Sequence, residues 1–241
     1  MILAYPAAPS PARGATGKQA CPAKTTQEGV DYSFVPPDGE VQVSAHHHKF
    51  HHDEAERRRW QDPEAILGEI GLCPGDVFVD VGCGDGFFTL PAARMTGPEG
   101  HVYGVDIDGE SLAELRGKAD AEGLDNLTLV AGEAENEVLC RSCADVVFFG
   151  IDLHDFYDQA KVLENAMRMI KPSGKLVDLD WRKVPLDMGP PLEIKFSVEH
   201  SSHLIESAGF IVVSVSEPGP MHYMIMARPA GGEGNDGDEC R

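Results

Sequence analysis

An acidic residue followed by regularly spaced glycines lies near the end of the first third of the chain. Asp80 is followed by Gly82, Gly84 and Gly86 at every second position. Glycine adopts positive φ angles and lets a backbone approach a ligand closely, because it has no Cβ atom. A glycine loop that leads into a helix N-terminus is typical of a cradle for a nucleotide-type cofactor. A dinucleotide fingerprint would need glycine in place of Phe87, and no Gly-Lys-Ser/Thr sequence of a phosphate-binding P-loop follows.

Other residues that could do chemistry follow neighbouring predicted strands. Asp106 stands near the end of the strand predicted over 101–108, where a carboxylate can accept hydrogen bonds from both hydroxyls of a ribose. Asp152 and His154 follow the strand predicted over 144–151, and an imidazole can act there as a general base. His154 could equally be a capping or packing histidine. Because parallel strands place their carboxyl ends at one edge of a sheet, we expect these side chains near the glycine loop.

Hydrophobic runs and turn residues predict the elements that position these side chains. Apolar runs too short for helices indicate buried parallel strands, and apolar residues at helical spacing indicate amphipathic helices between them. Asp62 with Pro63, and Asp108, are expected to begin helices. A turn is expected at 171–174 and a hairpin around 218–220. The predicted strands are 77–81, 101–108, 127–130, 144–151, 175–181, 210–217 and 222–229, with helices from about Phe87, over 62–70, 111–121, 159–170 and 197–207.

Composition limits the classes of function. The chain has 241 residues, 42% of them hydrophobic, and a net charge of −20, which disfavours a nucleic-acid substrate because such a surface repels phosphates. No apolar run approaches the roughly 18 residues of a membrane span. The six cysteines are scattered and no secretory signal is visible, so a reducing, cytoplasmic location is expected. Cys140 and Cys143 form a C-x-x-C pair, interpreted as a loop dithiol because no second pair completes a zinc site.

The ends of the chain differ in composition from its centre. Residues 1–45 are rich in proline and small residues, and residues 230–241 are acidic and glycine-rich, so both are expected to be disordered. Residues 46–229 form the predicted folded domain. Five histidines within 46–52 open a charged segment, 46–61, and we expect them to be solvated and not to form a metal site, since no further ligands are evident.

The D-x-G-x-G-x-G pattern from Asp80 resembles motif I of the class I S-adenosylmethionine-dependent methyltransferases. The segments D-L-H-D-F at 152–156 and K-P-S-G at 171–174 are similar to those of small-molecule methyltransferases of the ubiquinone/menaquinone-biosynthesis type. The resemblance implies an α/β fold, a Rossmann-like doubly wound sheet of seven strands in the order 3-2-1-4-5-7-6, with strand 7 antiparallel and helices on both faces. It also implies methyl transfer from S-adenosylmethionine to a small molecule.

The resemblance assigns roles to individual residues. Asp80 would lie at the amino-acid end of the cofactor, Asp106 at its ribose and Glu133 at its adenine, and 46–61 would cap the site. The expected cofactor-binding residues are Asp80, Gly82, Cys83, Gly84, Gly86, Asp106, Ile107, Glu133 and Ala134; the expected substrate residues are Phe50, Asp152, Trp181 and His222, with His154 as catalytic residue and no metal. A monomer or homodimer is expected.

Two other functions stay open from the sequence. One is a non-catalytic protein that binds S-adenosylmethionine on the same fold, and the other is an NAD-linked oxidoreductase, which the glycine spacing disfavours. The methyl acceptor is equally open, since a quinol, thiol, metalloid, amine or phenol is compatible with the sequence.

Overall fold

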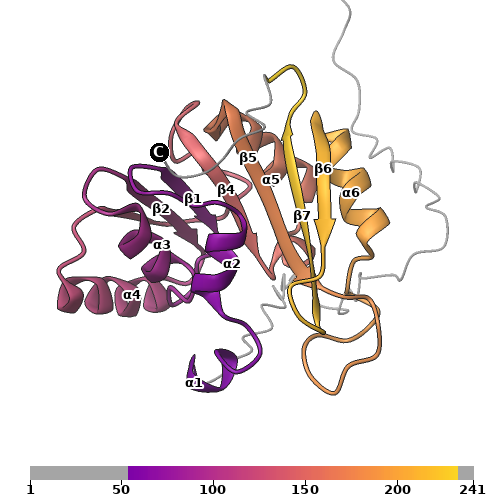
Figure 1. Ribbon diagram of the computed structural model, residues 1–241, viewed down its shortest axis with the longest axis horizontal. Coiled ribbons are helices and arrows are strands. Elements are labelled where there is room, and N and C mark those ends of the chain that lie inside the picture. The colour runs from indigo at the N-terminus through magenta and orange to yellow at the C-terminus, as the bar shows by residue number, and fades with distance from the viewer. Residues whose placement is uncertain (1–53, 233–241) are drawn as a thin grey trace, which may run out of the picture. The chain divides into compact units, whose positions relative to one another are not determined.

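A seven-stranded mixed sheet organises the part of the chain that the computed structural model describes, residues 54–232 (Figure 1). The strand order is β3-β2-β1-β4-β5-β7-β6. Strands β1 to β5 pair in parallel, while β7 is antiparallel to both β5 and β6. The predicted fold is therefore confirmed. The strands are β1 Val77–Val81, β2 His101–Asp106, β3 Leu127–Ala131, β4 Ala144–Gly150, β5 Ile170–Trp181, β6 Phe210–Ser216 and β7 His222–Pro229.

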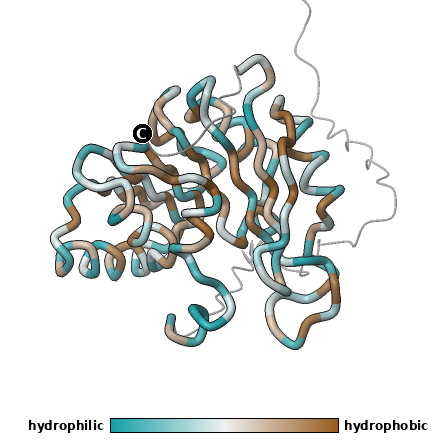
Figure 2. The backbone as a smooth tube through the Cα atoms, viewed as in Figure 1, coloured by the Kyte–Doolittle hydropathy of each residue, from teal (hydrophilic) through white to brown (hydrophobic). Residues whose placement is uncertain are grey.

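Helices cover both faces of this sheet, because successive strand residues point to opposite sides. Phe78 packs in a core with residues of α2, α3 and α4, while its neighbour Val79 packs in a second core with residues of α5 and α6. Figure 2 shows hydrophobic residues along the central strands and a largely hydrophilic α1. The helices are α1 Glu54–Arg57, α2 Pro63–Glu69, α3 Thr89–Thr96, α4 Gly109–Glu122, α5 Gln159–Met169 and α6 Val198–Ser207, with a 3-10 turn, η1, at Leu153–Asp155.

Most predicted element boundaries agree with the structure. The side chains of Asp62 and Asp108 accept backbone N–H groups at the starts of α2 and α4, as expected for N-caps. The predicted turn at 171–174 is wrong, because these residues lie within β5. Strand pairing starts at Ile170 and resumes at Lys175 after a shift in register, so the irregularity is accommodated inside the strand.

The carboxyl ends of the parallel strands form the edge that concerns function. Helix α1 and the loop between β5 and α6 lie along this same edge, at the bottom of Figure 1. Cys140 and Cys143, just before β4, were predicted to be a loop dithiol; they are joined by a disulfide, so that prediction is wrong. Within residues 54–232, no helix combines the length and apolar character needed to cross a membrane. Phe50, the histidine-rich segment, the predicted disordered residues 1–45 and residues 233–241 of the predicted disordered tail lie outside the described residues. Residues 230–232 of that tail are described, and the N–H of Ala230 donates to the Gly209 carbonyl at 2.9 Å.

Candidate functional site

The glycine loop after β1 needs glycine for both conformation and space. Gly82, Gly84 and Gly86 have φ angles of 78°, 52° and 94°, a region that other residues rarely adopt. A Cβ atom on Gly82 would collide with the Asp152 carboxylate, and one on Gly86 would collide with the side chain of Leu115. A Cβ atom on Gly84 would meet no atom within 4 Å. The loop is therefore tight against the protein at two glycines and open at the middle one.

Asp106 ties this loop to the end of β2. Its carboxylate accepts hydrogen bonds from the backbone N–H of Gly84 at 2.7 Å and of Asp108 at 2.8 Å. Its backbone carbonyl accepts the N–H of Gly132 at 3.0 Å, which joins the loop after β3 to the same point. Because each carboxylate oxygen has two lone pairs, both can still accept a ribose hydroxyl.

Further predicted cofactor-binding residues lie near Asp106, with Glu133 the one predicted to contact the adenine. Ile107, directly after β2, is 47% exposed. Glu133 is exposed and accepts a hydrogen bond from Asn136 at 2.7 Å. Ala134 and Cys83 are buried. The bond between Gly132 and Asp106 thus joins the loops that carry Ile107 and Glu133, and Ile107 is the exposed apolar side chain there.

Asp80 is a buried carboxyl at the start of the loop. It is 2% exposed and accepts a hydrogen bond from the Thr89 hydroxyl at 2.6 Å. Burial raises its pKa to about 7, and the hydrogen bond from Thr89 and the charge of Arg57 counteract that rise only in part. A carboxyl in this state would be stabilised in its ionised form by a cationic group bound beside it.

Arg57 in α1 supplies the opposite charge over the same loop. Its guanidinium lies 3.8 Å from the centroid of the Phe87 ring, and its Nε donates to Gln61 at 2.7 Å. Burial lowers its pKa to about 10, although Asp85, Asp80 and Asp152 favour its charge. Arg57 was not among the residues predicted from the sequence. The run of three arginines at 57–59 signalled a basic cap, but only the fold shows which of them faces the glycine loop.

Asp152 reaches the glycine loop from the end of β4. The preceding residue, Ile151, has a φ of 71°, a strained conformation for a β-branched residue of the kind that accumulates at functional sites. Both carboxylate oxygens of Asp152 are buried and have no hydrogen-bond partner among residues 54–232. Burial, with the charges of Asp80 and Asp180, raises the pKa of Asp152 well above its usual range. Asp152, predicted to contact substrate, lies directly against Gly82.

His154 forms a buried pair with Asp180 of β5. Its Nδ1 lies 2.8 Å from Asp180 Oδ2, and because a carboxylate only accepts, Nδ1 carries the hydrogen and Nε2 is left as the proton acceptor. Nε2 lies 3.4 Å from Asp155. Burial opposes protonation of the ring, but the hydrogen bond to Asp180 and the surrounding carboxylates outweigh it, so the pKa of His154 is raised.

Three rings form a wall beside this pair. Trp181 lies 4.6 Å from His222 and 5.5 Å from Trp60, and Trp60 is stacked on His222 at 5.5 Å. Burial, helped by the charges of Arg57 and Lys195, lowers the pKa of His222 to about 3, so its ring is neutral. Two of the predicted substrate residues, Trp181 and His222, are therefore in contact. Trp60 brings the described part of the predicted cap against them.

The arrangement fits a cofactor with an adenosine end and a charged amino-acid end. The loop presents an open backbone at Gly84 and a ribose acceptor in Asp106, with the buried carboxyl of Asp80 and the half-buried guanidinium of Arg57 beside it. Among the residues that the structure describes, no group of three or more His, Cys, Asp or Glu side chains is placed to hold a metal ion.

Comparison with known proteins identifies relatives of this chain. Residues 73–206, more than half of the chain, match a family model described as "Methyltransferase domain". Demethylmenaquinone methyltransferase of Geobacillus kaustophilus is 30% identical over 138 residues, which are 57% of this chain and 59% of that protein. The ubiquinone/menaquinone biosynthesis C-methyltransferase UbiE of Vibrio parahaemolyticus is 30% identical over 61% of this chain and 56% of its own length. The chain thus spans little more than half of these relatives.

A solved structure is similar over a larger share. The crystal structure of a SAM-dependent methyltransferase from Aquifex aeolicus is 30% identical, with a TM-score of 0.68, and the match covers 73% of this chain and 98% of that one.

Proposed function

The chain belongs to the methyltransferase domain family, and we propose that it transfers a methyl group from S-adenosylmethionine to a small-molecule acceptor. The observation that carries this proposal is the pair of opposite charges over the glycine loop, buried Asp80 and half-buried Arg57. Asp80 would hold the ammonium group of the cofactor's methionine moiety, and Arg57 would hold its carboxylate. A dinucleotide has no such zwitterionic end. The similarity to UbiE and to the Aquifex protein supports the same cofactor.

The protein's part in such a reaction is mainly to position the reactants. When bound, the cofactor supplies an electrophilic methyl group on a sulfonium, so alignment in a site from which water is excluded provides most of the acceleration. Asp106, Ile107 and Glu133 would hold the adenosine end. The ring wall of Trp60, Trp181 and His222 would exclude water on the acceptor side. His154 would take a proton from an acceptor that must lose one, with Asp180 orienting its ring.

Calorimetry with S-adenosylhomocysteine and NADH on the same preparation tests this function. We expect S-adenosylhomocysteine to bind and NADH not to bind. Binding of NADH alone would refute the proposal in favour of an oxidoreductase. A screen of small-molecule acceptors with radiolabelled S-adenosylmethionine then separates an enzyme from a non-catalytic binding protein, because only the enzyme yields a labelled product.

Arg57→Met is expected to weaken binding of S-adenosylhomocysteine by about 10- to 100-fold, since hydrogen bonds to a charged group contribute about 1.5–3 kcal/mol. Arg59→Met serves as the matched control, because Arg59 belongs to the same segment but is exposed. Calorimetric titration of both variants measures the difference. Equal affinity of the two variants would show that Arg57 does not bind the cofactor.

We further propose that the acceptor is a small molecule, that nucleic acid is not a substrate and that the protein is cytoplasmic. The net charge of −20 supports the first two statements, because it disfavours a polyanion near the site. The domain limits and the choice between monomer and homodimer stay predictions from the sequence.

A further inference from the structure

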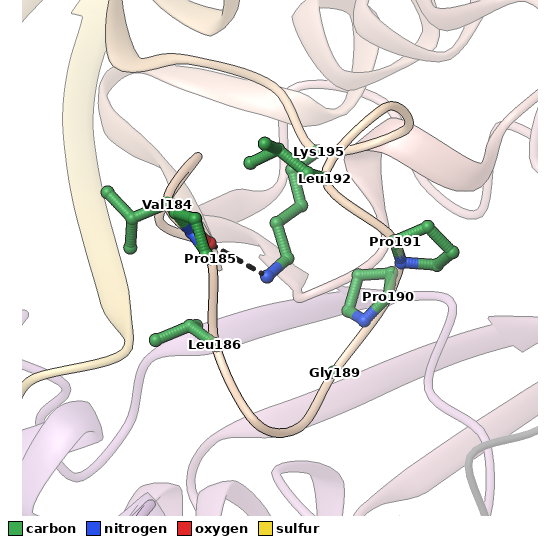
Figure 3. Close-up of a pocket in the computed structure, with 8 residues that line it drawn as sticks. All are labelled: Val184, Pro185, Leu186, Gly189, Pro190, Pro191, Leu192 and Lys195. Atoms are coloured by element: carbon green, nitrogen blue, oxygen red, sulfur yellow. Dashed lines mark hydrogen bonds between the residues drawn. The ribbon is translucent and has the colours of Figure 1, made fainter.

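A second hollow, of about 500 Å³, lies in the loop between β5 and α6. Its lining is mostly apolar and includes one basic group: Val184, Pro185, Leu186, Pro190 and Leu192 line it together with Lys195 (Figure 3). Figure 3 shows the Lys195 side chain reaching into the loop between the segment of Val184 and that of Pro190. None of these residues takes part in the cofactor site described above.

Lys195 is buried without a charged partner. It is 2% exposed, and its ammonium group makes one long hydrogen bond, 3.4 Å to the Val184 carbonyl. Asp180 attracts it electrostatically, but no hydrogen bond or ion pair joins the two residues, and the Asp180 oxygens accept instead from His154 and from the Trp181 N–H. Within residues 54–232, Lys195 therefore retains two N–H donors without a hydrogen-bond partner. Lysines are almost never fully buried unless they are paired, which indicates that a ligand supplies the missing acceptor.

The hollow adjoins the aromatic wall of the candidate active site. The Lys195 ammonium lies 5.7 Å from the centroid of the Trp181 ring. A Cβ atom added to Gly189 would lie 2.9 Å from the same ring, so the loop rests directly on Trp181. The positive charges of Lys195 and Arg57 both lower the pKa of His222, which packs on Trp181. A molecule in the hollow would thus be next to the wall that separates it from the cofactor loop.

We propose that this hollow binds an apolar carboxylate, with its carboxylate paired to Lys195 and its apolar part against the proline and leucine walls. Lys195 is the only basic side chain among the described lining residues, so the site can neutralise one negative charge but not a phosphate dianion. A phenol, with a pKa near 10, would be neutral at pH 7 and could not form the ion pair.

Three probes of equal length test the charge preference: 4-phenylbutyrate, 4-phenylbutanol and 4-phenylbutylamine. Binding is followed by tryptophan fluorescence, because the two tryptophans of the chain, Trp60 and Trp181, both lie in the wall beside the hollow. We expect the carboxylate to bind at least tenfold more tightly than the alcohol, and the amine most weakly. Equal binding of carboxylate and alcohol to the unaltered chain would overturn the proposal, whatever the stability of any variant.

Two lysine variants test whether Lys195 is the side chain that causes the preference for the carboxylate. Lys195→Met is expected to remove the preference for the carboxylate while leaving the affinity for the alcohol unchanged, since the aliphatic stem is kept. Lys183→Met is the control, because Lys183 is an exposed residue of the same loop. A preference that persists in Lys195→Met, or that is lost in Lys183→Met, would contradict the assignment to Lys195.

Titration with S-adenosylhomocysteine on the same samples separates this inference from the proposed function. If the unaltered chain shows no preference for the carboxylate but binds S-adenosylhomocysteine, the hollow is not the proposed ligand site and the cofactor site stays in place. A carboxylate preference in a chain that does not bind S-adenosylhomocysteine would do the reverse. If Lys195→Met also loses S-adenosylhomocysteine binding, Lys195→Gln is tested in its place. Its preference for the carboxylate and its binding of S-adenosylhomocysteine are measured in the same way.

Discussion

Replacing Asp80 with Asn is expected to weaken S-adenosylhomocysteine binding by about 100-fold, because the partner of a buried charge pair is lost. In the unaltered chain the pKa of Asp80 is about 7 without ligand. Its ionised form would pair with the ligand's ammonium group. As the pH increases towards 7, affinity should therefore increase about tenfold for each pH unit, and above 7 it should become constant. The Asn variant should lack this dependence. Calorimetry between pH 5.5 and 8 measures both effects.

The same substitution is expected to stabilise the ligand-free protein at pH 8. The native state binds the Asp80 proton more tightly than the unfolded chain, since burial raises the pKa from 3.8 to about 7. Stability from this group is therefore present below about pH 4 and is lost as the pH rises to 7. The loss corresponds to about 4 kcal/mol at most, using about 1.36 kcal/mol for each pKa unit.

Thermal unfolding at pH 4 and pH 8 tests whether Asp80→Asn stabilises the ligand-free protein. The melting temperature of Asp80→Asn should exceed that of the unaltered chain at pH 8 and approach it at pH 4. Asp125→Asn removes the charge of an exposed residue and should change neither value. A variant that binds S-adenosylhomocysteine normally, or that melts lower at pH 8, would show that Asp80 is a structural carboxylate.

His154→Ala is expected to lower kcat by about 10²- to 10⁴-fold with an acceptor that must lose a proton, the usual contribution of a general base. The raised pKa of His154 predicts that kcat increases with pH through a value above the ordinary 6.5, because only the neutral ring accepts a proton. Asp180→Asn should lower that apparent pKa, since Asp180 stabilises the protonated ring. A pH profile of kcat for the three proteins measures these changes.

His203→Ala is the matched control for this series, because His203 is an exposed histidine of α6. S-adenosylhomocysteine binding should be unchanged in all variants, which separates a catalytic defect from unfolding. Unchanged turnover of His154→Ala would make His154 a packing residue and would remove the base from the mechanism. An apparent pKa that does not move in Asp180→Asn would exclude Asp180 as its positioning residue.

The cofactor side of this site was predictable because it is local in sequence. Asp80 and the three glycines stand within seven residues. The glycine spacing disfavours a dinucleotide cradle, and the missing Gly-Lys-Ser/Thr sequence argues against a P-loop. Asp106 follows from the rule that parallel strands meet at one edge, and the structure indeed bonds it to Gly84. A turn was wrongly predicted at 171–174, because Pro and Gly signal a break in local structure but cannot show that strand pairing resumes after a register shift.

The acceptor side required long-range contacts. His154 and Asp180 lie 26 residues apart and meet only because β4 and β5 are neighbours in the sheet. Trp60, Trp181 and His222 come from three distant segments, and Lys195 looks like an ordinary loop lysine until its burial is known.

The sequence by itself determined the α/β fold, the glycine cradle and the acidic residues around it, since strand periodicity and glycine geometry are encoded by neighbouring residues. Tertiary structure alone decided which arginine covers the loop, which carboxylate orients His154 and which lysine is buried without a partner. The reason is physical. Burial and the approach of distant charges decide whether a side chain is a solvated surface group or a group with a shifted pKa. Neither can be predicted from the spacing of neighbouring residues in the sequence.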